Sequence, residues 1–389
     1  MKLRNKFRAG DWVEVRSKEE ILRTLDKHGR LEGMPFMPEM FSFCGKRLQV
    51  YMRAHKTCDT VFPVRGRRVH RTVHLETRCE GSAHGGCQTG CLIFWKEDWL
   101  RPIPTDSAAN LVLLQTHASD PGADGCTESD VWSNAKTSDP RDGTANYHCQ
   151  ATQLPYATSD LSWWDLRQYL EDYFSGNVNL ADLARGTMYS AYYNLSQVGV
   201  GLGRPMRWFY ERICWLWGRS RFPRAAGDIP NGQRTPVAEL DLQPGELVRV
   251  KSHEEILRTV TVDGKNRGMS FDAEMVPYCG GTFRVLKRVS QIVDEKTGKL
   301  QTMKNPCIIL NTVVCQGRYS GCRMFCPRSL YPFWREIWLE RVALDESPAC
   351  AVQAPVDISE DSGSTISRRC SGERRDPSER RGLVEIGKD

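Results

Sequence analysis

Residues 10–50 read GDWVEVRSKEEILRTLDKHGRLEGMPFMPEMFSFCGKRLQV, and residues 245–285 read GELVRVKSHEEILRTVTVDGKNRGMSFDAEMVPYCGGTFRV. The second stretch follows the first at a constant offset of 235 without a gap, and 19 of the 41 aligned positions are identical. Identity at close to half of the positions over such a span is not expected by chance. The sequence therefore predicts two related modules on one chain, with a function that resides in what the copies share.

The start of each copy has the pattern of a half-buried strand. Apolar and polar residues alternate over Trp12–Val15 in the first copy and over Leu247–Val250 in the second. A Ser-x-x-Glu capping box follows, at Ser17 and at Ser252, and predicts a short helix in both copies. Another strand is expected after the shared Cys-Gly pair, and the rest of each module is expected to form β-hairpins.

Two resemblances bear on the fold. Modules that open Gly-[Asp/Glu]-x-Val-x-Val resemble SH3-like barrels of the KOW and ribosomal type. The strings at Cys79–Leu100 (CEGSAHGGCQTGCLIFWKEDWL) and Cys307–Cys315 (CIILNTVVC) are similar to those of an uncharacterised bacterial protein family with two cysteine-rich repeats. That family implies no activity. The fold class expected is α+β, mainly β, with two tandem SH3-like β modules, a small helical insert between them and a disordered C-terminal tail.

The length of 389 residues predicts more than one folded unit. The repeats define a first Cys-rich module at 1–104 and a second at 240–343. Residues 105–158 are expected to be an acidic flexible linker, because seven acidic residues stand there against two basic ones. Residues 159–224 are expected to be the helical insert, and 344–389, which are poor in apolar residues, the disordered tail.

Within the insert, Asp160 and Asn179 are expected to cap helices, and Arg204–Arg221 to form a third helix rich in tryptophan and arginine. Basic amphipathic segments of this kind can lie at a membrane interface, which makes peripheral membrane contact one interpretation. The alternative is that the apolar residues of this helix pack on the other two. No run of eighteen apolar residues occurs, so no transmembrane span is expected.

Fifteen cysteines indicate either disulfides or metal ligands. The N-terminal residues lack the apolar core of a signal peptide, which favours a reducing, cytoplasmic location. Clustered cysteines in that compartment are typically metal ligands or redox groups.

The ends of the two modules align three cysteines in each, the last two with the spacing C-x3-C. Two thiolates from one tight turn and a third from a neighbouring strand can bind zinc, which needs a fourth ligand for a closed tetrahedral site. Two zinc sites are therefore predicted; an iron–sulfur cluster and buried small hydrophobic residues are the alternatives. The predicted ligands are Cys58, Cys79, Cys87 and Cys91 in the first module and Cys307, Cys315, Cys322 and Cys326 in the second, with Cys44, Cys279 and His84 as alternates.

The sequence favours a binding or scaffolding protein over an enzyme. A catalytic zinc would need three ligands, an open position and a nearby base. The first module offers several such groups, but the second has a single histidine, so catalysis by histidine would not be shared. The alternative is a redox or metal-dependent enzyme that uses the Cys/His cluster of the first module. The groups considered are His55, His70, His74, Glu76 and His84 in the first module and His253 in the second.

An unidentified protein is the expected partner, at features that both modules share. These are Glu39, Met40 and the Trp-Lys/Arg-Glu segments with their counterparts, although Met40 and the tryptophans are also natural core residues. Nucleic acid is a second partner class, because a run of arginines in a hairpin tip could meet phosphates; a solvated turn is the alternative. That run consists of Arg65, Arg67, Arg68 and Arg71.

Overall fold

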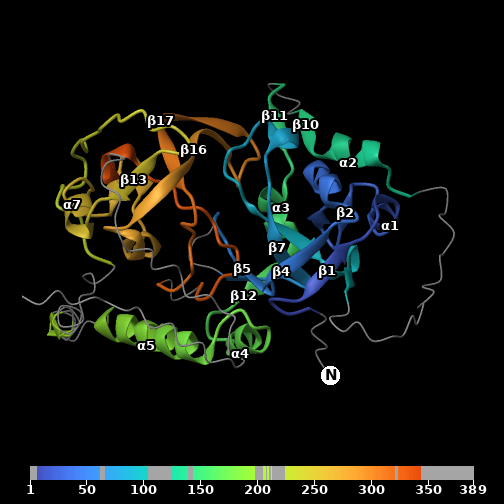
Figure 1. Cartoon of the computed structure of the whole chain (residues 1–389), viewed down its shortest axis with the longest axis horizontal. Helices are drawn as coiled ribbons and strands as arrows, with labels where there is room; N and C mark the ends of the chain where they lie inside the picture. Colours follow the sequence, from blue (N-terminus) through green and yellow to red (C-terminus); the bar gives the residue numbers. More distant parts are fainter. Residues whose placement is uncertain are drawn as a thin grey trace, which may run out of the picture. The chain divides into compact units, whose positions relative to one another are not determined.

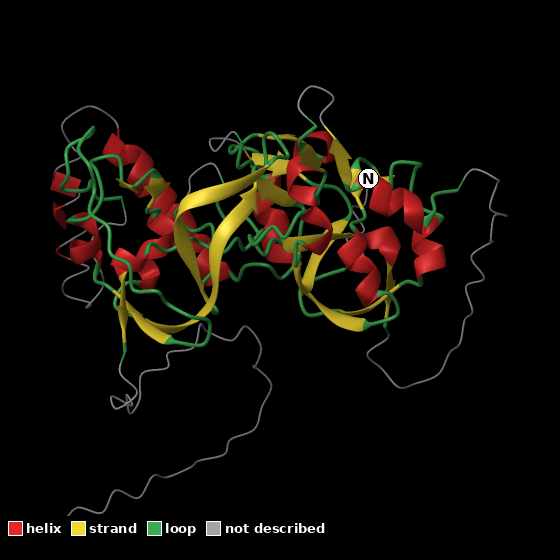
Figure 2. Cartoon of the chain, turned by 90° about the horizontal axis from the view of Figure 1, so that it is seen from above, coloured by secondary structure: helices red, strands yellow, loops and turns green. Residues whose placement is uncertain are grey.

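The alternating residues at the start of each repeat form one strand in each of two curled antiparallel sheets, as Figure 1 shows. The computed structural model describes residues 7–61, 66–103, 125–138, 143–197, 224–319 and 323–342, with 205–206, 208–209 and 212 in addition. Within these residues the chain is mixed α+β and built mainly of strands, which confirms the expected class and the two β modules. The SH3-like identity of the modules stays a prediction. In the second view the strands of the sheets curl rather than lie flat (Figure 2).

The sheet of the first repeat has the order β8-β7-β4-β1-β9, and all neighbouring strands pair antiparallel. Val13 and Val15 of β1 are fully buried, whereas Trp12 is half exposed, which is the alternation that the sequence shows. The strands are β1 (Trp12–Val15), β4 (Arg47–Arg53), β7 (Thr72–Arg78), β8 (Leu92–Lys96) and β9 (Leu100–Pro102).

The sheet of the second repeat has the order β17-β16-β13-β18 and is likewise antiparallel. Its long β16–β17 hairpin takes the place of the shorter strands β4 and β7. The strands are β13 (Leu247–Val250), β16 (Thr282–Val293), β17 (Leu300–Leu310) and β18 (Leu339–Arg341).

Small elements also recur between the repeats. Ser17 and Ser252 cap the two short helices, each in a complete capping box, as the sequence predicts. Each helix is followed by a hairpin whose two strands have two residues each, and then by a 3-10 helix that ends before the Cys-Gly pair. A second 3-10 helix precedes the last strand. The pairs are α1 (Lys18–Leu22) and α7 (His253–Leu257), β2 (Arg30–Leu31) and β14 (Lys265–Asn266), β3 (Met34–Pro35) and β15 (Met269–Ser270), η1 (Pro38–Phe43) and η4 (Ala273–Tyr278), η3 (Glu97–Trp99) and η5 (Glu336–Trp338).

Each repeat buries an aromatic cluster under its sheet. In the first, the ring of Phe36 meets the edge of Trp99 at a centroid distance of 5.2 Å, and the Nε1 of Trp99 donates to Thr24 Oγ1 at 3.1 Å. The second repeat has the same arrangement, in which Phe271 lies 5.4 Å from Trp338. Both tryptophans are fully buried, so the hydroxyl acceptor removes the cost of burying the indole N–H.

Part of the segment that its composition assigns to a flexible linker folds against the first sheet. Residues 125–138 and 143–158 contain α2 (Glu128–Asn134), the hairpin of β10 (Lys136–Ser138) and β11 (Ala145–Tyr147), and α3 (Gln150–Ala157). Their apolar side chains belong to the core of the first repeat. The acidic residues dominate the average composition, but the apolar residues between them are enough to form a buried face.

The insert begins with a strand rather than a helix. Asp160, expected as a helix cap, lies in β12 (Ser159–Leu161), which pairs with β6 (Gly66–Arg68), and β6 in turn pairs with β5 (Lys56–Cys58). The first helix of the insert, α4 (Arg167–Phe174), starts seven residues after Asp160. Helix α5 (Leu180–Gln197) is capped by Asn179 as predicted, because its Oδ1 accepts from the amide of Asp182 at 2.8 Å. The third predicted helix, 204–221, falls largely outside the described residues, as does the tail.

The two repeats contact each other within one compact unit that spans residues 1–344. The Oε1 of Gln88 accepts from the backbone amides of Ser290 and Gln291 at 2.6 and 3.1 Å. The guanidinium of Arg78 stacks over the ring of Tyr331 at 3.8 Å from its centroid. Both contacts join the loop around the first cysteine cluster to the second repeat.

Candidate metal centre

The loop between β7 and β8 carries three cysteines of the first repeat, Cys79, Cys87 and Cys91. Cys79 follows β7, and its amide donates to the carbonyl of Cys91 at 2.9 Å, which closes the base of the loop. Gly81 has a φ of 78°, and a Cβ at this position would overlap the carbonyl oxygen of Cys87. The tight return of the chain therefore requires glycine at this position.

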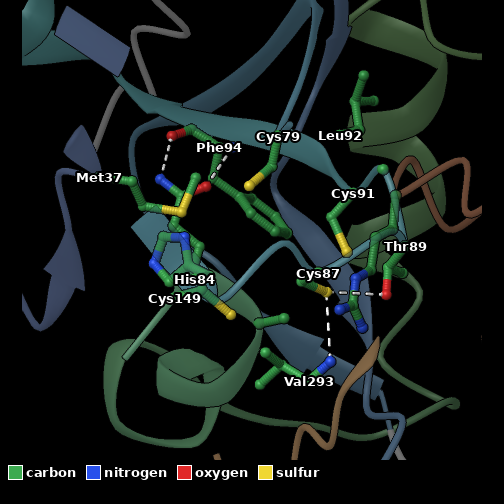
Figure 3. A pocket seen from close by; sticks show the side chains of 14 residues that line it. Met37, Cys79, His84, Cys87, Thr89, Cys91, Leu92, Phe94, Cys149 and Val293 are labelled. Atoms are coloured by element: carbon green, nitrogen blue, oxygen red, sulfur yellow. Dashed lines mark hydrogen bonds between the residues drawn. The ribbon is translucent and has the colours of Figure 1, made fainter. Parts of the chain in front are cut away.

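A fourth thiol reaches this loop from outside the repeat. Cys149 precedes α3 and lines the same pocket as Cys79, Cys87 and Cys91. Figure 3 shows the four sulfur atoms directed into this space, with His84 beside them. The pocket encloses about 460 Å³, including its opening to solvent. Four thiols are donors of the kind that a structural zinc site or an iron–sulfur cluster uses. Among the described residues, however, the three ligand atoms that lie within 4.8 Å of one another are those of Glu39, Cys79 and His84.

Three thiols of this pocket, those of Cys79, Cys91 and Cys149, have raised pKa values, so they are hard to ionise without a cation. Burial raises the pKa of Cys91 to about 12 and that of Cys149 to about 11. Burial, followed by the charge of Glu39, also raises the pKa of Cys79 strongly. A reactive cysteine needs the opposite environment, one that lowers its pKa. A bound cation would favour the thiolates, and its binding would release protons.

Beside Cys79 lies a buried Glu39–His84 pair. The ligand atoms of Glu39, Cys79 and His84 lie within 4.8 Å of one another. The Oε1 of Glu39 is 2.9 Å from Nδ1 of His84 and accepts from the amide of Ala83 at 3.0 Å. Burial opposes the charge of Glu39, but the contacts with His84 and the amide lower its pKa below the ordinary value.

Two polar atoms of this pair are buried without a hydrogen-bond partner, Oε2 of Glu39 and Nε2 of His84. Leaving such atoms unsatisfied costs free energy. The pair therefore offers further ligand atoms to a cation bound next to Cys79, and it fixes the ligand loop through the amide of Ala83.

A second group of thiols combines both repeats. The amide of Cys58, at the end of β5, donates to the Sγ of Cys326 at 3.1 Å. The hydrogen bond with Cys58, followed by burial, raises the pKa of Cys326, and burial followed by the charge of Glu274 raises the pKa of Cys315. The structure thus brings Cys58, assigned from sequence to the first cluster, to Cys326 of the second.

The remaining predicted ligands lie elsewhere. Cys307 is buried in β17, where its nearest polar partners are the guanidinium of Arg335 at 3.4 Å and the carbonyl of Asn305 at 3.5 Å. Cys44 and Cys279 end the helices η1 and η4 and pack against the cores of their repeats. Cys322 falls outside the described residues.

The other histidines of the first module, which were candidates for catalysis, have structural or exposed positions. The Nδ1 of His74 is 2.8 Å from the carbonyl of Ile93, and burial lowers the pKa of this histidine to about 3. His55 is buried beneath α4, whereas His70 and Glu76 are exposed. In the second repeat His253 is buried, and its ring lies 5.9 Å from that of Phe271.

The described members of the arginine run are engaged within the chain. Arg67 donates to both the hydroxyl and the carbonyl of Thr158 on the segment that leads into β12. Arg68 pairs with Asp165 at 2.9 Å, and Arg71 with Asp98 at 2.6 Å. The contacts of Arg67 and Arg68 hold the segment around β12 on the hairpin of β5 and β6, whereas Arg71 pairs within the first repeat. Arg65 lies outside the described residues.

The features shared by both repeats are mostly core. Met40 and Met275 are at most 2% exposed, and Glu39 and Glu274 are also buried. They are therefore not part of a surface that could meet a partner. Among the described residues, no helix is both long enough and apolar enough to cross a membrane.

Comparisons of the chain with protein-family models, curated proteins and solved structures found no match. What the chain does must therefore be inferred from its own residues. Of these, the sequence missed Cys149, because it lies in the stretch assigned to a linker. The signal available was local: the apolar segment QATQLPYA follows Cys149 directly and forms a helix.

Proposed function

We propose that this protein is a cytoplasmic, non-catalytic binding or scaffolding protein with two SH3-like modules, stabilised by zinc. The observation that carries the proposal is that Cys79, Cys87, Cys91 and Cys149 line one pocket, beside the Glu39–Cys79–His84 group. Zinc held by four thiolates contributes folding free energy to small β modules that have limited cores. His84 would support this site through Glu39 and is the alternate ligand.

A structural rather than catalytic role fits the surroundings of the four thiols. Their loop is held by hydrogen bonds, and the thiols line a pocket with little polar surface. The only amide from the second repeat that reaches a thiol of this pocket, within the described residues, comes from Val293, which donates to Cys87 Sγ at 3.3 Å. A backbone amide that donates to a metal-bound sulfur does not touch the metal itself, but it orients the sulfur.

Exposed apolar side chains of the insert support the proposed binding role. Trp163 and Trp164 are 57% and 68% exposed, and Leu166 and Leu170 on and before α4 are also exposed. Large apolar side chains gathered at a surface mark interaction sites in many proteins. A protein partner that buries these side chains is the kind we expect.

The test is elemental analysis with an ultraviolet–visible spectrum on the full chain, purified without oxygen and without chelator. We expect bound zinc and no visible colour, loss of one equivalent in Cys149→Ser, and no loss in Cys44→Ser, the matched control outside the pocket. A brown protein with iron and sulfide would replace zinc by an iron–sulfur cluster and move the function to redox chemistry. Full metal content in Cys149→Ser would overturn the proposed ligand set.

A further inference from the structure

The turn of the short hairpin differs in charge between the two repeats. In the first repeat Glu32 lies in the turn between β2 and β3, and its Oε2 accepts from Nζ of Lys96 at 2.7 Å. Arg267 stands at the same place in the second repeat, 235 residues later, with a φ of 47° against 52° for Glu32. The counterpart of Lys96 is Arg335, because each follows a Phe-Trp pair and precedes a glutamate. An ion pair in one copy is thus replaced by two cations in the other.

Among the residues described, Arg335 carries a buried charge without an ion-pair partner. It is 8% exposed, and it donates to the carbonyls of Asn305 at 2.6 Å and Arg267 at 3.1 Å. Arg267 likewise forms no ion pair with the described part of the chain, and the Nε of each arginine is buried without an acceptor. Burying a cation without a counter-charge costs free energy, which a bound anion would offset.

The two arginines line a pocket of the second repeat that has a surplus of positive charge. The pocket encloses about 450 Å³, including its opening to solvent. Its two carboxylates do not neutralise it, because Glu239 is exposed and Oε1 of Glu336 is paired with Arg288 at 3.0 Å. The lining contains four cationic side chains, those of Arg267, Arg288, Lys304 and Arg335.

Hydrogen bonds fix the wall that carries Arg267. Asn266 is 1% exposed, and its Nδ2 donates to the carbonyls of Pro236 at 3.0 Å and Thr259 at 2.8 Å. The amide of Arg267 donates to Oγ1 of Thr235 at 3.0 Å. Donors that are held in place before a ligand arrives lose less conformational freedom on binding. The turn is therefore a prepared support for the guanidinium.

We propose that this pocket binds a phosphate group, which takes the role that the carboxylate of Glu32 has in the first repeat. Guanidinium groups bind phosphate oxygens through paired N–H donors. A phosphate monoester carries close to two negative charges at pH 7, so two guanidinium groups and the ammonium of Lys304 favour it over a carboxylate. The inference goes beyond the proposed function, since none of these cations belongs to the proposed zinc site.

The experiment measures thermal unfolding of the full chain in phosphate and in chloride at one ionic strength. Arg267→Glu installs the residue of the first repeat, which adopts the same turn there. Arg258→Glu is the matched control, an exposed arginine at the end of α7 that undergoes the same change of charge outside the pocket. We expect phosphate to raise the melting temperature of the wild type and of Arg258→Glu, but not that of Arg267→Glu. An equal rise in all three proteins, or none in the wild type, would overturn the proposal.

Calorimetric titration distinguishes the sources of the phosphate group. Inorganic phosphate and O-phosphoserine should both bind, each more weakly by about tenfold or more in Arg267→Glu. Tighter binding of inorganic phosphate supports a site for the free ion, and tighter binding of O-phosphoserine supports a site for a phosphate ester. Acetate that binds as tightly as phosphate would refute the phosphate pocket.

Metal analysis of the same variants separates this inference from the proposed function. Arg267→Glu should contain as much zinc as the wild type. Phosphate binding in a chain without zinc would overturn the proposed function alone. A zinc-containing chain that binds no phosphate would overturn the phosphate pocket alone.

Discussion

Replacing Asp172 by asparagine should destabilise the protein far more than the loss of an ordinary ion pair. Asp172 lies in α4 with no exposed surface, and its Oδ2 accepts from Nζ of Lys56 at 2.5 Å. Lys56 is 3% exposed, and its side chain lies between the rings of Tyr169 and Phe325. The pair joins the insert to the strand that carries Cys58.

The magnitude follows from burial. Removing one partner of a buried ion pair leaves the other charge uncompensated, which costs about 3–5 kcal/mol. The matched control is Glu340→Gln, which breaks the pair with Arg249 at 2.5 Å, where the side chains are 36% and 57% exposed. An exposed pair contributes roughly 0–1 kcal/mol. The two changes each remove one carboxylate, so their difference isolates the effect of burial.

The pH dependence provides a second, independent signature. Burial lowers the pKa of Lys56 below its ordinary value, although Asp172 opposes the shift. Without Asp172 the pKa should fall further, so that over a wider pH range below the ordinary value of 10.5 the folded variant binds fewer protons than the unfolded chain. Stability then rises with pH. The loss in free energy of unfolding caused by Asp172→Asn should therefore be greatest near pH 7 and become smaller toward pH 10.

The assay is urea unfolding of wild type and both variants between pH 7 and pH 10, with metal content held constant. A loss below about 1 kcal/mol for Asp172→Asn at pH 7, equal to that of the exposed control, would refute the argument. A deficit that grew with pH would refute the assignment of Lys56 as the stranded charge.

Three further changes test other parts of the structure. Gly81→Ala should lower zinc content and thermal stability more than the control Gly45→Ala. Both glycines have a positive φ, but only at Gly81 would the added Cβ overlap backbone atoms. Metal content and thermal unfolding of the two variants test this. Trp99→Phe should cost roughly 1–3 kcal/mol, because it leaves the hydroxyl of Thr24 without its indole donor, and unfolding in urea that shows no change would contradict this. His74, whose pKa burial lowers to about 3, makes stability fall as pH drops below its ordinary value of 6.5, by at most about 1.4 kcal/mol per pH unit, so His74→Gln should flatten the acid limb of the stability curve.

The elements inside each repeat could be predicted because local patterns determine them. The capping boxes at Ser17 and Ser252 and the alternation in β1 and β13 need only neighbouring residues. The grouping of the thiols depends instead on contacts between distant segments. Cys58 and Cys326 are 268 residues apart, and no spacing in the sequence relates them.

The arginine run illustrates a second limit of the sequence. Charged residues in a hairpin tip have the same pattern whether they meet a partner or another part of the chain. Here Arg67 and Arg68 hold β12 and the turn before α4, an association that depends on strand pairing between β6 and a segment some 90 residues away. Neither hydropathy nor charge within the hairpin carries that information.

Each repeat contributes atoms to the surroundings of the other repeat's cysteines. The first supplies Cys58 to the thiol group of the second, and the second supplies the amide of Val293 to Cys87 of the first. A gene duplication starts with two self-sufficient copies, but here either copy expressed alone would lack atoms that surround its own cysteines. Deletion of one copy would thus damage the other, which makes the duplication hard to reverse and lets the two sequences diverge without separating.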